Sequence, residues 1–144
     1  MLLVDVNVLV YAHREDAERH DEYRRWLEDV VNADAAFGIS DLVLSGFTRA
    51  VTHPRIFNPP TDVSTAVDAA EHIRAQPNCV TIDPGPRHWE IFTRLCRESG
   101  VKGGLVADAY FAALAIESGS EWVTTDRDYS RFHGLRSRHP FADR

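Results

Sequence analysis

Four aspartates carry the chemistry that this sequence suggests. Asp5 follows the short apolar run Leu2–Val4, which is typical of a buried strand. Asp126 and Asp128 follow another expected strand, in the stretch TTDRDY. Asp108 falls in the predicted first turn of the helix before that strand, among apolar and small residues. Because functional groups of a parallel sheet gather beyond the carboxyl ends of its strands, we expect these acids at one edge.

Carboxylates gathered in this way repel one another, and their pKa values rise unless a cation neutralises them. Hard divalent cations prefer oxygen ligands, and Mg²⁺ or Mn²⁺ suits carboxylates together with water. One or two such ions can activate water and stabilise an in-line displacement at phosphorus. The pattern therefore predicts metal-dependent hydrolysis of phosphodiester bonds.

Each polar residue also has a simpler explanation when it is taken alone. Asp5 is compatible with a strand-end cap, and Asn7 with a cap of the first short helix. Asp108 is compatible with a charge that the helix dipole favours. Asp126 and Asp128 are compatible with an Asx-type turn. Only the joint pattern indicates a metal site.

Alternating strands and helices must position these acids. The apolar periodicity predicts strands at 2–4, 35–39, 79–82 and 121–125, and helices at 16–31, 41–52, 63–75, 87–99 and 105–118. A further short strand is expected near Arg136. The helical spacing places Val67 and Trp89 on inward faces. This alternation implies βαβ units and a parallel sheet in an α/β fold.

Composition limits the class of protein. The chain has 144 residues, of which 44% are hydrophobic, as expected for one globular domain covering residues 1–144. Its 22 acidic and 16 basic residues give a formal net charge of −6, which argues against a basic nucleic-acid surface. Four of those charges belong to the proposed metal site, so the remaining surface is nearly neutral. We therefore expect RNA binding to depend on the metal and on a few local arginines.

Other classes are disfavoured. No apolar run approaches the length that spans a bilayer, and the N-terminus lacks the basic region of a signal peptide. Cys79 and Cys96 form no C-x-x-C pattern, so reduced thiols and a cytoplasmic location are expected. The seven histidines show no zinc-finger or zincin spacing.

Taken in order, the motifs resemble the PIN-domain nucleases, and most closely the toxin ribonucleases of bacterial VapBC toxin–antitoxin modules. The resemblance covers essentially the whole chain. It is carried by DVNVL from residue 5, FTR from residue 47, THPRIF from residue 52, DA and AA from residues 108 and 112, and TTDRDY from residue 124.

The resemblance implies an α/β/α sandwich of three layers with a central parallel sheet. It also implies an endoribonuclease that depends on Mg²⁺ or Mn²⁺. Asp5 and Asp108 would be the main metal ligands and catalytic acids. Asp126 would complete the catalytic cluster, and Asp128 would bind the metal beside it or through water.

The same resemblance implies roles for two further polar residues and predicts the molecules that the chain binds. Asn7 becomes a catalytic candidate that orients water or a carboxylate, and Thr125 is a second, weaker candidate. The expected partners are an RNA substrate, a cognate VapB-type antitoxin and a second copy of the chain in a homodimer, with no membrane association.

One departure from the family pattern concerns a second metal site. The family often has glutamate in a pattern S-x-x-x-L-x-E-F, where this chain has SDLVLSGF and places Gly46. Asp41 cannot replace it, because five residues turn it roughly 140° around the helix. Either water or an acid such as Asp21 or Glu22 would have to fill the gap. Glu117 lies about half a turn away from the face of Asp108, and we interpret it as structural.

Two alternatives follow from these residues. A haloacid-dehalogenase-like phosphatase also begins with a strand and an aspartate, but Asn7 stands where that class needs a second acid. A degenerate PIN fold that binds without cleaving is the more serious alternative, because Gly46 replaces the glutamate. The four retained acids favour the nuclease.

The basic residues near the motifs give a weaker signal. Arginine suits bidentate phosphate contacts, and four arginines flank the acidic motifs. The chain has one lysine, in a glycine-rich loop before the helix of Asp108. For each of these side chains, a solvated surface position or a salt bridge is the favoured interpretation. They are Arg14, Arg49, Arg55, Arg127 and Lys102.

Overall fold

The computed structural model describes residues 1–142 and contains a five-stranded sheet. Its strands are β1 (Leu2–Val4), β2 (Phe37–Ile39), β3 (Cys79–Thr81), β4 (Glu121–Val123) and β5 (Ser137–Arg138). They lie in the order β3-β2-β1-β4-β5, and every pairing is parallel. The expected parallel sheet is confirmed, and β5 is the short strand predicted near Arg136.

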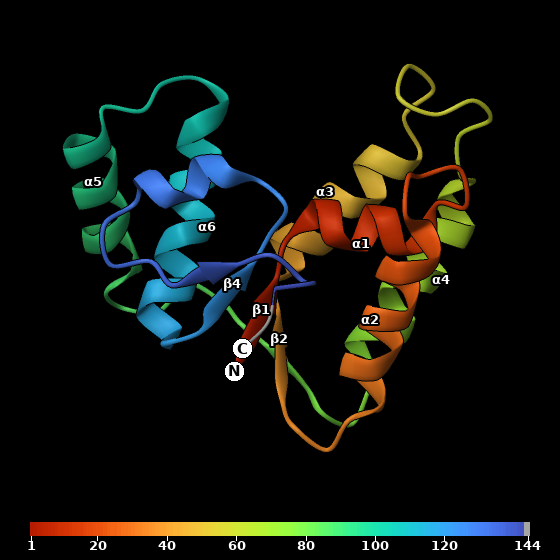
Figure 1. Ribbon diagram of the computed structural model, residues 1–144. Coiled ribbons are helices and arrows are strands. Elements are labelled where there is room, and N and C mark those ends of the chain that lie inside the picture. Colours follow the sequence, from red (N-terminus) through yellow and green to blue (C-terminus); the bar gives the residue numbers. More distant parts are fainter. Residues whose placement is uncertain (143–144) are drawn as a thin grey trace.

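Helices cover the sheet in two groups (Figure 1). The elements are α1 (Val6–His13), α2 (His20–Asn32), α3 (Asp41–Val51), α4 (Val63–Arg74), α5 (His88–Ser99), α6 (Gly104–Ser118) and the 3₁₀ helix η1 (Arg127–Arg131). The first group consists of α1 to α4, and the second of α5 and α6, so the three-layer arrangement is confirmed. Within residues 1–142, no helix has the length and apolarity needed to cross a membrane.

Two inward-facing assignments are wrong. Val67 is 43% exposed and Trp89 is 69% exposed. Helix α4 instead buries Ala66, Ala70 and Ile73, which repeat at the i, i+4, i+7 spacing of one helical face. Trp89 is likewise displaced from the buried face of α5 by one residue, which is about 100° around the helix.

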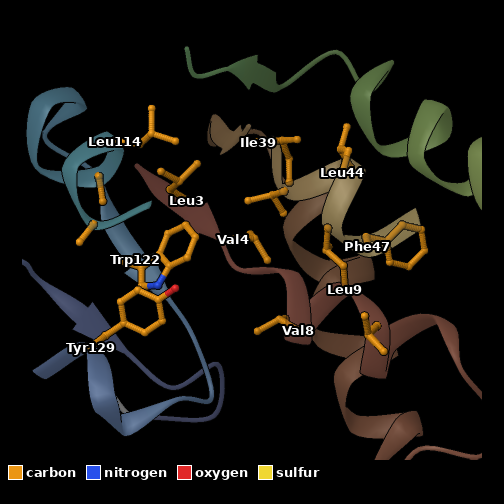
Figure 2. Packing of buried hydrophobic residues seen from close by; sticks show 14 of the residues in the cluster. Leu3, Val4, Val8, Leu9, Ile39, Leu44, Phe47, Leu114, Trp122 and Tyr129 are labelled. Carbon is orange, nitrogen blue, oxygen red and sulfur yellow. The ribbon is translucent and has the colours of Figure 1, made fainter. Parts of the chain in front are cut away.

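Strand β1 lies at the centre of the core, between the two groups of helices. Leu3 and Val4 are fully buried (Figure 2). Trp122 of β4 packs beside them and contacts Tyr129, with the two rings tilted by 55° at a centroid distance of 5.5 Å. Because β1 is enclosed on both faces, the residue that follows it has a fixed position, and that residue is Asp5.

Candidate active site

Asp5 is held by hydrogen bonds to both oxygens of its carboxylate. It follows β1 and is the N-cap of α1, where the Val6 amide donates to Oδ1 at 2.7 Å. The Thr124 hydroxyl, at the end of β4, donates to Oδ2 at 2.7 Å. Asp5 is only 5% exposed. The simple cap interpretation is therefore correct, and the same side chain is a fixed, buried carboxylate.

The surroundings of Asp5 disfavour its charge. Burial raises its pKa most, the charges of Asp108 and Asp126 raise it further, and the hydrogen bonds from Thr124 and Val6 oppose part of the rise. The net effect is a pKa raised from 3.8 to about 6. The carboxylate is thus placed where a cation would relieve both the desolvation and the repulsion.

Asp108 faces the same region from α6. Its Oδ1 accepts a hydrogen bond of 3.2 Å from the Tyr129 hydroxyl. Burial and the charges of Asp126 and Asp128 raise its pKa, while the Tyr129 hydrogen bond and the Arg131 charge oppose the rise. The helix begins at Gly104, so the expectation that Asp108 lies in the first turn is wrong.

Asp126 and Asp128 follow β4 in a tight turn. The Asp126 amide donates to the Thr124 hydroxyl oxygen at 3.0 Å, which links this turn to Asp5 through one side chain. Oδ1 of Asp126 accepts from the Asp128 amide at 2.8 Å and caps η1, as the Asx-turn interpretation predicts. Asp128 is exposed and lies 3.5 Å from Arg131. The structure thus places Asp128 at the rim of the site.

Burial of the Tyr129 hydroxyl is a feature that the sequence reasoning missed. Tyr129 is 3% exposed, and burial together with the charges of Asp5, Asp108 and Asp126 raises its pKa strongly. The phenol is therefore a permanent donor to Asp108 at neutral pH. The signal for this role in the sequence is the position of Tyr129 directly after Asp128 in the stretch TTDRDY.

Thr124, rather than Thr125, orients Asp5. In the sheet, Val4 pairs with Val123, so the residues that follow these two strand ends lie beside one another. The register of β1 against β4 would have identified Thr124, but the sequence alone shows only two adjacent threonines. Thr125 instead lines a neighbouring cavity.

Asn7 has no capping role, because Asp5 occupies that position. It lies in the first turn of α1, is exposed, and makes no side-chain hydrogen bond within residues 1–142. Its amide is thus available to solvent two residues after the buried carboxylate.

Gly46 lies against α1 and not against open space. A Cβ atom at this position would be 3.0 Å from Val6 Cγ2, a tight contact with a branched side chain. A glutamate could be accommodated only if Val6 moved. At the position of the family glutamate, α3 therefore packs closely against Val6 of α1.

The acids considered as replacements for that glutamate are engaged elsewhere or exposed. Asp41 is paired with Arg74 at 2.8 Å, as its predicted orientation away from the site requires. Glu22 is paired with Arg19 at 2.7 Å, and Asp21 is exposed. Gly46 thus faces the apolar Val6 side chain, and Asp41 and Glu22 are held by arginines.

Two charged residues near the motifs are structural. The Glu117 carboxylate accepts from the Gly85 amide at 2.7 Å and the Arg87 amide at 2.8 Å, which fixes the loop before α5. Arg14 pairs with Asp16 at 2.7 Å and lies over the Phe57 ring at 4.4 Å. Both observations agree with the structural interpretation of these side chains.

The donor set fits a divalent cation that retains water ligands. Within residues 1–142, no three side chains of His, Cys, Asp or Glu lie close enough to form a ready metal cage. However, the charges of Asp108 and Asp126 raise the pKa of Asp5, and the charge of Asp126 also raises the pKa of Asp108, so the three carboxylates share one region. Mg²⁺ is usually held by one or two carboxylates and several waters, which is the arrangement these acids can provide.

Comparison with known proteins identifies the class of this fold and site. The PIN domain family model matches residues 2–135, so the chain belongs to the PIN-domain family. Ribonuclease VapC43 of Mycobacterium tuberculosis is 45% identical over 97% of this chain and 95% of the relative. Ribonuclease VapC25 of the same organism is 39% identical over 97% of this chain and 99% of the relative. The resemblance to VapC ribonucleases is confirmed.

Solved structures show the same fold. VapBC2 from Rickettsia felis, crystallised with a DNA fragment from its promoter, has a TM-score of 0.69 and 17% identity. That match covers 96% of this chain and 97% of the solved chain. At this level of identity, the similarity supports the three-layer arrangement of helices and sheet.

Proposed function

We propose that this chain is an endoribonuclease of the VapC type, the toxin of a toxin–antitoxin pair, and that it hydrolyses RNA with Mg²⁺ or Mn²⁺. The observation that carries the proposal is the buried Asp5 carboxylate, which is fixed at both oxygens and repelled by Asp108 and Asp126. The 45% identity to a VapC ribonuclease over nearly the whole chain supports it.

Asp5 and Asp108 are the principal ligands in this proposal, with Asp126 completing the set and Asp128 acting at the rim through water. When bound, a divalent ion would activate water and neutralise charge that develops on the phosphate. Asn7, which is exposed beside the site, orients water or a carboxylate.

Two hydroxyl groups, those of Thr124 and Tyr129, hold the acids of this site in place. Thr124 holds Asp5 and the turn of Asp126 in one arrangement, because its oxygen both donates and accepts. Tyr129 holds Asp108. Groups that orient metal-binding side chains in this way tune affinity without touching the ion.

The same proposal extends to partners and location. We infer a single PIN domain over residues 1–144, a cognate VapB-type antitoxin, a homodimer and a cytoplasmic location. The names of the relatives and the VapBC assembly of the structural neighbour support the antitoxin. A binding module without cleavage is the second candidate, and only Gly46 favours it.

The test is cleavage of total RNA by the purified chain with Mg²⁺, Mn²⁺ or EDTA, with the cut ends mapped. The parent should cut only with metal, and Asp5→Asn should not cut. Asp41→Asn is the matched control, because it removes an equal charge from an exposed ion pair outside the site. Cleavage in EDTA, or equal rates for Asp5→Asn and the parent, would contradict the proposal. Undetectable cleavage by the folded parent would favour the binding module.

A further inference from the structure

A cavity of about 460 Å³ lies next to the acid site, between the turn after β4 and strand β5. Thr124 and Asp126, which belong to the acid site, also line this cavity, so the two regions are continuous. Its volume lies within the roughly 300–1,000 Å³ typical of small-molecule pockets.

Arg127 supplies a positive charge at this cavity. It is exposed, lines the cavity, and makes no ion pair within residues 1–142. Arg138 also lines the cavity, but its guanidinium lies 3.2 Å from Glu121, and the nearby Arg131, which does not line the cavity, pairs with Asp128. Arg127 is therefore the guanidinium at this cavity that remains available for an anionic ligand.

His139 forms an uncharged aromatic wall of the same cavity. Its Nδ1 accepts from the Phe141 amide at 3.1 Å, and its Nε2 lies 3.4 Å from the Tyr23 hydroxyl. Both ring nitrogens are thus engaged, which fixes the plane of the ring. Burial and the nearby charges of Arg19 and Arg127 lower its pKa, so the imidazole is neutral at pH 7.

Hydroxyl groups on the remaining wall are unused. Thr125, Ser130 and Ser137 line the cavity, and their side chains make no hydrogen bond within the described part of the chain. Hydroxyls both donate and accept, so they can pair with the polar edge of a nucleobase. Unpaired bases are typically recognised by such edge contacts together with stacking on an aromatic ring or on an arginine.

We propose that this cavity is a nucleotide subsite that receives one unpaired nucleotide of the RNA strand next to the scissile bond. The phosphate lies on Arg127, and the base lies against His139 with its edge toward Ser130 and Ser137. This inference rests on the proposed nuclease function, because continuity with Asp126 is what places the nucleotide beside the bond to be cut.

Binding tests the subsite without cleavage. AMP, CMP, GMP and UMP are titrated into the ¹⁵N-labelled full chain in EDTA, and amide shifts are followed. We expect saturable shifts confined to residues 124–139, with one base preferred. Arg127→Gln should weaken binding about 10-fold, as loss of a charge-assisted contact to phosphate does. Arg25→Gln, an equal charge change on α2 outside the cavity, should bind like the parent. Absence of saturable shifts there, or equal weakening by both variants, would overturn the subsite.

Cleavage of a random-sequence pool of 12-nucleotide RNAs is the second test. The double variant Ser130→Ala/Ser137→Ala should still cut but lose base preference at a position flanking the cut. An unchanged preference overturns the assigned role of these hydroxyls. If the parent cuts RNA but binds no nucleotide in the cavity, the subsite fails and the nuclease stands. If it binds nucleotides there without cutting RNA, the nuclease fails and the nucleotide site stands.

Discussion

Asp5→Asn should make the metal-free protein more stable while removing its activity. Burial and neighbouring charges raise the pKa of Asp5 from 3.8 to about 6 in the folded chain. Between those pH values the folded state binds more protons than the unfolded state, so stability falls as the pH rises through this interval. Above pH 6 the full penalty is present, and at 1.36 kcal/mol per pKa unit it is about 3 kcal/mol.

The substitution also removes a favourable contact. The carboxylate accepts one hydrogen bond at each oxygen, from Val6 and from Thr124, whereas an asparagine has a single acceptor oxygen. Losing one such bond costs about 1–2 kcal/mol, because the acceptor is charged. The net gain at neutral pH is therefore about 1–2 kcal/mol, or a rise in Tm of roughly 3–6 °C for a domain of this size.

Calorimetric melting in EDTA at pH 7.5 and pH 5.0 measures this effect. The gain in Tm should shrink at the lower pH, because the parent carboxyl is then mostly protonated and the penalty is roughly halved. Asp41→Asn, which breaks an exposed ion pair with Arg74, should show no gain at either pH. An Asp5→Asn variant that melts below the parent at pH 7.5, or whose gain is equal at both pH values, would refute this reasoning.

Three other predictions concern the groups around the acids. Tyr129→Phe should keep the buried ring but lower Mn²⁺ affinity several-fold by calorimetry, because Asp108 loses its donor; unchanged affinity would exclude this orienting role. Thr124→Val should reduce the rate of RNA cleavage about 10-fold or more, because it removes the hydrogen bonds that hold both Asp5 and the turn of Asp126. A rate equal to that of the parent would show that neither aspartate needs these hydrogen bonds. Gly46→Glu should lower the free energy of unfolding in urea by about 1–3 kcal/mol, because its Cβ would lie 3.0 Å from Val6 Cγ2. The additional change Val6→Ala should recover part of that loss. A Gly46→Glu variant as stable as the parent would contradict the close packing.

Much of the fold follows from local patterns, because helix periodicity and strand-ending aspartates are encoded over short stretches. Ser40 caps α3, and Gly100 ends α5 in the left-handed conformation; serine and glycine are residue types that favour these positions. The inward positions predicted for Trp89 and Val67 are wrong, since an error of one residue in helical phase moves a side chain from the core to the surface.

The acids of the candidate site could be identified from sequence, but their supports could not. Asp5 and Asp126 follow strands whose parallel pairing brings their ends together, and that is a consequence of fold class. The choice of Thr124 over Thr125 depends on the register of β1 against β4, which no local pattern encodes. The Tyr129 hydrogen bond depends on how η1 packs on α6, which is a tertiary contact.

The packing at Gly46 bears on how many ions the site holds. At the position of the family glutamate, α3 presents Gly46 against the apolar Val6 side chain. The acids that raise the pKa of Asp5 are Asp108 on α6 and Asp126 after β4. We therefore expect calorimetry to detect one Mn²⁺ per chain in the absence of RNA, bound through Asp5 and Asp108.

The rate at which Asp108→Asn cleaves RNA, relative to the parent, tests the central claim most directly. The variant retains a side-chain oxygen for Tyr129 and should stay folded. Mutation of a residue that only orients a metal ligand typically lowers activity roughly 10–100-fold, and loss of a ligand itself should lower it more. A drop of more than about 100-fold in Mg²⁺, with the melting curve intact, is the predicted result. A variant that cuts RNA as fast as the parent would show that these acids do not form the catalytic site.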